Sequence, residues 1–204
     1  MPGQRAGEAV RREQIVKAAY EVASREGLAQ LTIRQVAAKA RLSAGLVLFH
    51  FKSKDQLIVA LLDWLLATTT VLHIGTDIQK IGPPLDRLLA LLRQEMDRLS
   101  SEPRRIRLFF EFWVLGARNA DIRRKMRAEL ARYREAFRPM VQQVLVAEPD
   151  RFAHVTADGL AAVAVSFIKG CAVQSMIDPD RFDIEDYLSA AEALIGQLMA
   201  SPPR

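Results

Sequence analysis

Cysteine and histidine are scarce in this chain of 204 residues, and their scarcity excludes several kinds of site. Cys171 is the single cysteine, so no disulfide can form within the chain, and we expect a reducing compartment. His73 and His154 lie far from each other and from the cysteine, whereas zinc sites need clustered nitrogen and sulfur ligands. We therefore predict no metal site and no cofactor.

Motifs of catalysis are missing as well. The sequence has no glycine-rich phosphate loop, no nucleophile motif and no paired carboxylates at metal-binding spacing. We therefore predict no catalytic residues and a protein that is not an enzyme. A helical-bundle enzyme with an incidentally basic N-terminal segment remains the alternative.

Uninterrupted apolar runs are also missing. The first five residues have no apolar stretch, so we expect no signal peptide. Residues 57–74 and 155–177 are long and apolar, but they contain Asp63, Asp158 and Lys169, and such charges are costly inside a bilayer. We predict that both stretches are buried helices of a soluble, cytoplasmic protein that does not contact membranes.

The positive charge is concentrated at one end of the chain. Residues 1–60 contain ten Lys and Arg against five Asp and Glu, whereas residues 61–204 contain nineteen of each kind. The whole net charge of +5 therefore lies in the first sixty residues. A basic segment attached to a neutral body is typical of a protein that binds a polyanion.

Apolar residues recur at helical spacing along the chain, and no window alternates with a period of two. We predict an all-α fold of about nine helices, with one domain over 1–54 and a helical bundle over 55–204. Pro139 is expected to kink or split its helix. The expected helices cover residues 8–26, 33–40, 44–50, a long segment from 54, 85–99, 104–115, 119–146, 152–177 and 184–199.

Signals for two short helices follow the first predicted helix closely. Thr32 with Gln35 has the spacing of a capping box, and Ser43 is a good N-cap. These signals predict short helices over 33–40 and 44–50, joined by a tight turn. This is a helix-turn-helix, whose second helix can enter the major groove of DNA. We therefore predict that the protein binds double-stranded DNA.

The order and spacing of residues in this region resemble the TetR family of bacterial transcriptional regulators. The resemblance covers about residues 9–57. The residues that carry it are Thr32-x-Arg34-x-Val36-Ala37-x-x-Ala40, Leu42-Ser43-x-Gly45 and His50-Phe51-x-x-Lys54-x-x-Leu57. It implies a homodimer that represses transcription from a palindromic operator. It also implies that residues 1–54 form the DNA-binding helix-turn-helix domain, and that residues 55–204 form a ligand-binding and dimerisation domain that binds a small molecule and releases the DNA. Activation, or DNA binding without an effector, remains open.

The resemblance also implies which residues contact DNA. Thr32, Ser43 and Lys54 match phosphate contacts, and helix N-termini do favour phosphate oxygens. Arg34 matches a position that reads a base. The other candidates are Arg41, Ala44, Leu46, Phe49, His50 and Lys52.

Two positions depart from the family pattern. Arg41 lies in the turn, where the family usually has glycine, so a positive φ there is expected to cost energy that a phosphate contact could repay. Leu48 replaces a common tyrosine of the recognition helix, so its hydroxyl contact is absent. We expect base readout to depend on thymine methyl groups, Arg34, His50 and DNA shape.

An aromatic cluster in the C-terminal part has two interpretations. Phe109, Phe110 and Trp113 share one helix face, which fits a wall of the effector pocket. The alternative is ordinary core packing, with Glu111 paired to Arg107. Weaker pocket candidates are Trp64, Thr69, Tyr133 and Phe167.

Residues 118–138 contain eight basic and three acidic residues. A solvated helix face is one interpretation of this segment. The other is a surface whose arginines meet an anionic effector such as an organic acid or an acyl thioester.

Small residues line one face of the penultimate helix, and such a face permits close packing of helices. Together with the last helix it predicts a self-complementary dimer interface, whereas a monomer that buries both helices is the alternative. The predicted interface residues are Gly159, Ala162, Ser166, Gly170, Val173, Leu188 and Ile195.

Overall fold

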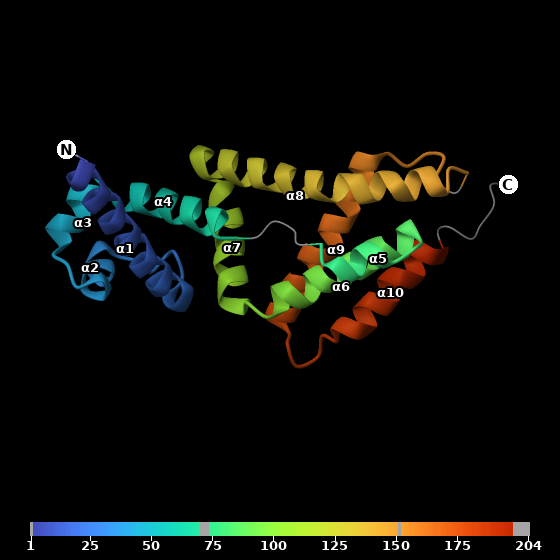
Figure 1. Cartoon of the computed structure of the whole chain (residues 1–204). Coiled ribbons are helices and arrows are strands. Elements are labelled where there is room, and N and C mark those ends of the chain that lie inside the picture. Colours follow the sequence, from blue (N-terminus) through green and yellow to red (C-terminus); the bar gives the residue numbers. More distant parts are fainter. Residues whose placement is uncertain (1, 70–73, 151, 198–204) are drawn as a thin grey trace. The chain divides into compact units, whose positions relative to one another are not determined.

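The computed structural model describes residues 2–69, 74–150 and 152–197, which form ten helices and no strand (Figure 1). The all-α prediction is therefore confirmed. The helices are α1 Pro2–Glu26, α2 Ile33–Ala40, α3 Ala44–His50, α4 Lys54–Ala67, α5 Thr76–Lys80, α6 Pro84–Ser100, α7 Pro103–Gly116, α8 Ala120–Ala147, α9 Ala157–Ile177 and α10 Ile184–Gln197.

Four elements differ from the sequence prediction. Helix α1 begins at Pro2, six residues before the predicted start at residue 8. The five-residue helix α5 was not predicted, because it is too short to show an apolar period. Pro139 lies inside α8 but does not split it, and the helix continues over 28 residues. Helix α9 begins five residues later than predicted, because Thr156 caps it: its Oγ1 accepts a hydrogen bond from Gly159 N–H at 3.1 Å.

The chain divides into two compact units. Unit 1 contains Met1–Thr70 and Arg104–Arg127, and unit 2 contains Val71–Pro103 and Ala128–Arg204. This division differs from the boundary at residue 54 that we predicted. The reason is α4, whose Leu57, Leu61 and Leu65 are fully buried in the core of unit 1.

Helix α1 is central to unit 1, where it packs against α2 and α4. Its Ile15 and Ala19 are fully buried in one core with Val47 of α3. Leu108 and Phe112 of α7 belong to the same core and are also fully buried. The helix-turn-helix is thus supported on one side by α1 and is continuous with the core formed by α4 and α7.

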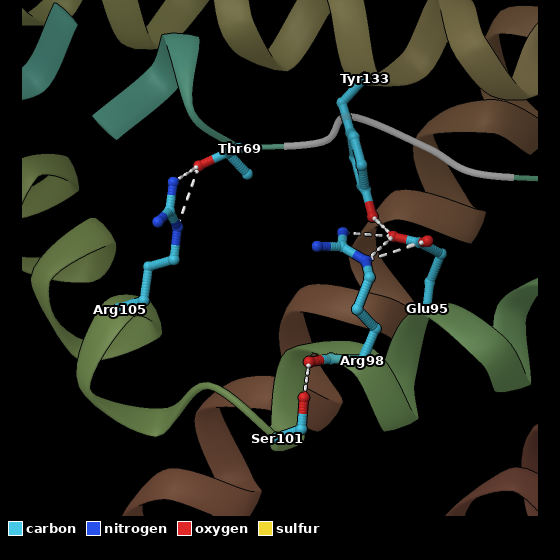
Figure 2. Close-up of polar contacts among 6 residues, drawn as sticks. All are labelled: Thr69, Glu95, Arg98, Ser101, Arg105 and Tyr133. Atoms are coloured by element: carbon cyan, nitrogen blue, oxygen red, sulfur yellow. Dashed lines mark hydrogen bonds and ion pairs between the residues drawn. The ribbon is translucent and has the colours of Figure 1, made fainter. Parts of the chain in front are cut away.

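Polar side chains of α7 fasten it to the rest of unit 1. Glu111 Oε2 accepts a hydrogen bond from Leu28 N–H at 2.6 Å, and Arg107 donates to the backbone oxygen of Ser24. Arg105 donates to Thr69 Oγ1 at 2.7 Å, as Figure 2 shows. Arg105 also donates to the backbone oxygen of Leu65 at 3.0 Å. Side chains of α7 thus satisfy backbone groups at the C-terminal ends of α1 and α4 that the helices themselves leave unpaired.

Helix α9 packs against α6 and α10 in unit 2. It is the one described helix with the length and apolar composition needed to cross a membrane. Core helices of soluble bundles meet the same criterion. One side of α9 is indeed buried inside unit 2, and its buried residues are Ala161, Ala164, Val165, Ile168, Cys171 and Ala172.

Gly27 ends α1 in a backbone conformation that favours glycine, with φ +89°. A Cβ atom there would lie 3.3 Å from Glu111 Oε2. We expect Gly27→Ala to lower the free energy of unfolding by about 1–2 kcal/mol, as measured by urea denaturation.

The matched control is Gly7→Ala, in the same helix. No atom lies within 4 Å of a Cβ at that position, so this change should leave the protein equally stable or slightly more stable. Equal effects of the two changes would contradict the role given to Gly27.

Candidate functional site

Side-chain caps define both helices of the helix-turn-helix, as predicted. Thr32 Oγ1 accepts a hydrogen bond from Gln35 N–H at 3.2 Å, and Gln35 Oε1 accepts one from Thr32 N–H at 2.9 Å. Ser43 Oγ accepts from Leu46 N–H at 3.1 Å and so begins α3. Both helices are short, so these caps contribute a large share of their local stability.

Arg41 turns the chain between α2 and α3 in the left-handed conformation, with φ 56° and ψ 45°. It is the one non-glycine residue with positive φ in the described part of the chain. Its N–H donates to the Ala38 oxygen, and Leu42 N–H donates to the Ala37 oxygen at 2.9 Å. The Arg41 side chain is exposed at this turn, where a cation can approach a phosphate.

The exposed face of α3 is apolar and continues into a lysine. Gly45, Leu48, Phe49 and Lys52 are exposed at spacings of three and four residues. Phe49 is 64% exposed and Leu48 is 42% exposed, which is unusual for large apolar side chains. Lys52 Nζ donates to the Phe49 oxygen at 2.9 Å and lies over the Phe49 ring.

The predicted groove-facing residues are thus not equally accessible. Phe49 is exposed, whereas Leu46 and His50 are half-buried. Ala44 packs partly against the core of unit 1. Leu48 was not among the predicted contacts, but its side chain lies on the exposed face of α3.

Arg12 of α1 holds the C-terminal end of α3, and the sequence analysis missed it. Its Nη1 donates to the His50 oxygen, and its guanidinium carbon lies 4.2 Å from the centroid of the Phe51 ring. A cation near a helix C-terminus interacts favourably with the helix dipole. No local signal could have revealed this contact, because the two partners are 38 residues apart in the sequence.

The predicted phosphate-contacting side chains lie at the surface of unit 1. Thr32 and Ser43 are exposed, as is Arg34, the candidate for reading a base. Lys54 is half-buried, and its Nζ donates to the Ala29 oxygen at 3.3 Å.

The aromatic residues that we predicted as a pocket wall divide between the two units. Phe109, Trp113 and Trp64 pack on the core of unit 1. Phe110 contacts Trp113, with ring centroids 5.5 Å apart. Tyr133 and Phe167 belong to unit 2.

Unit 2 contains a group of charged side chains inside its core. Glu95 of α6 is fully buried, and its Oε2 accepts hydrogen bonds from Arg98 Nη2 at 2.6 Å and from Tyr133 Oη at 2.7 Å (Figure 2). Lys169 Nζ lies 4.6 Å from the Tyr133 ring centroid. We call this group, together with the buried Glu129, the buried charge cluster. It consists of Glu95, Arg98, Glu129, Tyr133 and Lys169. The Arg132 side chain is 51% exposed and pairs with Glu129 from the surface.

Burial changes the protonation of two members of this cluster. Burial raises the pKa of the Tyr133 phenol, and the negative charge of Glu95 raises it further. Burial lowers the pKa of Lys169 to about 8, and Arg98 lowers it in the same direction. Tyr133 therefore acts as a neutral donor, and Lys169 loses its proton more readily than an exposed lysine.

One sequence signal could have revealed the buried charge cluster. Glu95 lies on the apolar stripe of α6, at helical spacing from Leu88, Leu91, Leu92 and Leu99, all of which are buried. A lone carboxylate on such a face requires buried partners. Tyr133 carried no comparable signal of its own.

Several basic residues within 118–138 form ion pairs near the surface. Arg124 pairs with Asp121, and Lys125 Nζ lies 2.5 Å from Asp63 Oδ1. Arg138 pairs with Glu135. These contacts fit the solvated helix face that we considered as one interpretation.

The predicted dimer residues of α9 and α10 are only partly exposed. Gly159 and Ser166 are exposed, and Ala162 and Val173 are half-buried. A Cβ atom at Gly170 would lie 3.4 Å from Tyr187 Oη of the same unit, and Leu188 is 2% exposed. The Ile195 side chain lies outside the described residues.

An exposed stripe nevertheless runs along α9, and we call it the exposed α9 face. Val163 is 46% exposed and Ile177 is 72% exposed, and on α10 Leu194 is 53% exposed. The residues of the exposed α9 face are Gly159, Val163, Ser166, Gln174 and Ile177.

Two family models match this chain. The model of bacterial regulatory proteins of the tetR family matches residues 15–61. The model of the C-terminal domain of BetI-type transcriptional repressors matches residues 84–200, which is more than half of the chain. A relative, the HTH-type transcriptional regulator BetI of Stenotrophomonas maltophilia (strain R551-3), is 28% identical over 156 residues, which cover 76% of this chain and 78% of the relative.

Solved structures share the fold. A transcriptional regulator from Pseudomonas aeruginosa PAO1 matches with a TM-score of 0.71 and 20% identity, over 98% of this chain and 93% of the other. A regulator from Saccharomonospora viridis in complex with choline matches with a TM-score of 0.68 and 17% identity, over 92% and 96%. The regulator FadR from Bacillus subtilis in complex with stearoyl-CoA matches with a TM-score of 0.66 and 15% identity, over 92% and 97%.

The capped helix-turn-helix, the all-helical body and the two family models lead to one assignment. The chain belongs to the TetR family of bacterial regulatory proteins and is a DNA-binding helix-turn-helix transcriptional regulator with a C-terminal domain of the BetI repressor type.

Proposed function

We propose that this protein is a cytoplasmic homodimer that represses transcription from a palindromic operator and is released from DNA by a small molecule. The observation that carries the proposal is the helix-turn-helix, in which side-chain caps begin two short helices and the face of α3 is exposed. The helix-turn-helix lies within residues 1–60, which carry the whole net charge of +5. The positive charge is suited to the phosphates of a DNA duplex, and the exposed helix face is suited to its major groove.

The phosphate contacts in this proposal come from helix N-termini and exposed cations. Thr32 and Ser43 begin α2 and α3, where unpaired N–H groups attract phosphate oxygens. Lys54 is in the first turn of α4, and Arg41 is exposed at the turn. These contacts place α3 on the duplex, but they carry no sequence information.

Sequence readout in this proposal combines one arginine with apolar contacts. Arg34 is exposed at the start of α2 and can donate two hydrogen bonds to a guanine. Leu48 and Phe49 can contact thymine methyl groups, and Lys52 follows them at the end of the exposed face. Because α3 offers few polar groups, DNA shape contributes the rest of the selectivity.

The dimer in this proposal forms through the exposed α9 face and α10. Val163, Ile177 and Leu194 are large apolar side chains that a monomer would leave in water. Gly159 and Ser166 lie on the same exposed face of α9, and their small size permits a close approach of a second copy. A two-fold pair would present two helix-turn-helix heads to two successive major grooves.

Effector control is supported by related proteins and by the chain's own interior. Solved structures of the same fold contain choline and stearoyl-CoA. The BetI-type model covers the residues of α6, α8 and α9 that form the buried charge cluster of unit 2. If the ligand binds more tightly to a dimer whose two heads do not fit successive major grooves, it lowers the population of the form that binds DNA.

The first test is selection of bound sequences from a random DNA library, with binding repeated over a salt series. An enriched palindrome with a steep salt dependence supports a dimeric operator reader. Salt-sensitive binding without enrichment would contradict sequence-specific repression.

Arg34 and Lys54 are expected to act differently on DNA. Arg34→Ala should relax the preference at one base pair of each half-site, by about 1–3 kcal/mol. Lys54→Ala should weaken binding to every sequence and lower the salt slope by about one per protomer. Fluorescence anisotropy with the selected operator and with mismatched duplexes measures both effects.

The control for these changes is Lys80→Ala, which removes an exposed lysine of unit 2 whose ion pair with Asp77 spans 3.5 Å. This variant should bind DNA as the unaltered protein does. If Arg34→Ala weakens all duplexes equally, Arg34 contacts phosphate and does not read a base.

Val163→Glu tests the dimer interface. A carboxylate buried in an apolar interface should raise the dimer dissociation constant at least about tenfold, as measured by sedimentation equilibrium. The matched control is Val146→Glu, which changes an 80% exposed valine of α8 away from the exposed α9 face. Equal dissociation constants for both variants would contradict this interface.

A further inference from the structure

The recognition helix α3 has almost no side chains that form hydrogen bonds. His50 is the one polar side chain among its seven residues, and it is half-buried. Its Nδ1 atom is buried and has no hydrogen-bond partner among the described residues. At most one ring nitrogen of His50 is therefore available to DNA. The face that α3 exposes consists of Gly45, Leu48 and Phe49, none of which carries a polar side chain.

The Phe49 side chain is 64% exposed, yet neighbouring groups restrict its ring. Lys52 Nζ lies over the ring, 5.1 Å from its centroid, and donates a hydrogen bond to the Phe49 oxygen. The His50 ring meets the Phe49 ring edge to face, with ring centroids 5.3 Å apart. A side chain that is already held in one orientation loses little conformational entropy on binding. Phe49 is thus an apolar contact that is formed before DNA arrives.

The major groove of DNA offers one apolar group to such a face. This group is the C5-methyl of thymine, whereas the other groups that distinguish base pairs there are hydrogen-bond donors and acceptors. Leu48 and Phe49 gain free energy when they remove a methyl group from water. Because they form no hydrogen bonds, they do not distinguish the O4 acceptor of thymine from the N4 donor of cytosine.

A second natural base carries the same apolar group. In 5-methylcytosine the methyl group is bonded to the same ring atom as in thymine. In the major groove the two bases differ only in the O4 acceptor of the one and the N4 donor of the other. A face that contacts the methyl group and has no partner for either polar group therefore binds both bases alike.

We propose that α3 recognises the C5-methyl group of pyrimidines, so that Leu48 and Phe49 bind 5-methylcytosine as they bind thymine. This inference rests on the proposed contact of these two side chains with thymine. Cytosine methylation then raises the affinity of an operator wherever the methyl group meets the exposed face of α3. The identity of a base is read by Arg34, which is exposed and can donate hydrogen bonds to guanine.

The first experiment is selection of bound sequences from three random duplex libraries in parallel. One library is ordinary DNA, one has 5-methylcytosine in place of every cytosine, and one has deoxyuridine in place of every thymine. The ordinary library should yield an operator with thymine at the contacted positions. In the methylated library, thymine and 5-methylcytosine should interchange at these positions. The deoxyuridine library should lose the preference there, because neither of its pyrimidines has a methyl group.

Fluorescence anisotropy with single substitutions in the selected operator measures the size of the effect. Deoxyuridine at a contacted thymine should lower the affinity about fourfold, which corresponds to one buried methyl group. At the same position, a 5-methylcytosine–guanine pair should bind about fourfold more tightly than a cytosine–guanine pair. Substitutions at thymines that α3 does not contact serve as internal controls and should leave the affinity unchanged.

A doubly substituted variant, Leu48→Ala with Phe49→Ala, separates direct contact from an effect of methylation on DNA shape. Direct contact requires these side chains, so the variant should bind methylated and unmethylated operators equally. Both side chains are exposed, so the variant should fold, as circular dichroism verifies. Val146→Ala is the matched control, because Val146 is 80% exposed on α8 of unit 2, and it should keep the preference.

The outcomes separate this inference from the proposed function. An enriched operator in which thymine and 5-methylcytosine do not interchange overturns the methyl readout and leaves the operator reader standing. A methyl preference that persists in the doubly substituted variant also overturns it, since DNA shape would then cause the preference. If no library is enriched, operator reading itself fails, and the methyl readout fails with it.

Discussion

The orientation of the recognition helix depends on α1, because the seven residues of α3 are too few to form a stable helix in water. Val47 is fully buried against the core of unit 1, and Arg12 of α1 binds the last carbonyl group of α3 and covers the Phe51 ring. Ser43 begins the helix and α1 fixes its end. The face of α3 with Leu48 and Phe49 points to solvent because the opposite face is buried in this core.

Charged side chains have different surroundings in the two compact units. Unit 1 keeps its cations at the surface, where Arg34, Arg41 and Lys52 remain solvated until a polyanion replaces the water. Unit 2 buries Glu95 and Lys169 in its core, where each charge needs a partner and an uncompensated charge is costly. The cations of unit 1 thus provide long-range attraction for DNA, whereas the charges inside unit 2 act on one another.

Much of the helix-turn-helix could be predicted from the sequence because its signals are local. Thr32 and Gln35 are three residues apart, and the left-handed turn at Arg41 follows from its place between two capped helices. The pocket residues were less predictable, since an aromatic face such as Phe109 and Trp113 looks the same whether it packs on a core or lines a site. Gly170 is predicted to lie on a dimer face because it is small, and no local pattern indicated that it is close to Tyr187 of its own unit.

The sequence by itself determined the all-helical fold, the capped ends of α2 and α3, the basic N-terminal segment and the family pattern, because each of these depends on neighbouring residues or on composition. Only the tertiary structure decided that α4 belongs with the helix-turn-helix, that Arg12 holds α3, and that Glu95, Tyr133 and Lys169 meet in one buried cluster. The physical reason is distance along the chain. Burial and ion pairing join residues that are tens of positions apart, and no local pattern records which of them will meet.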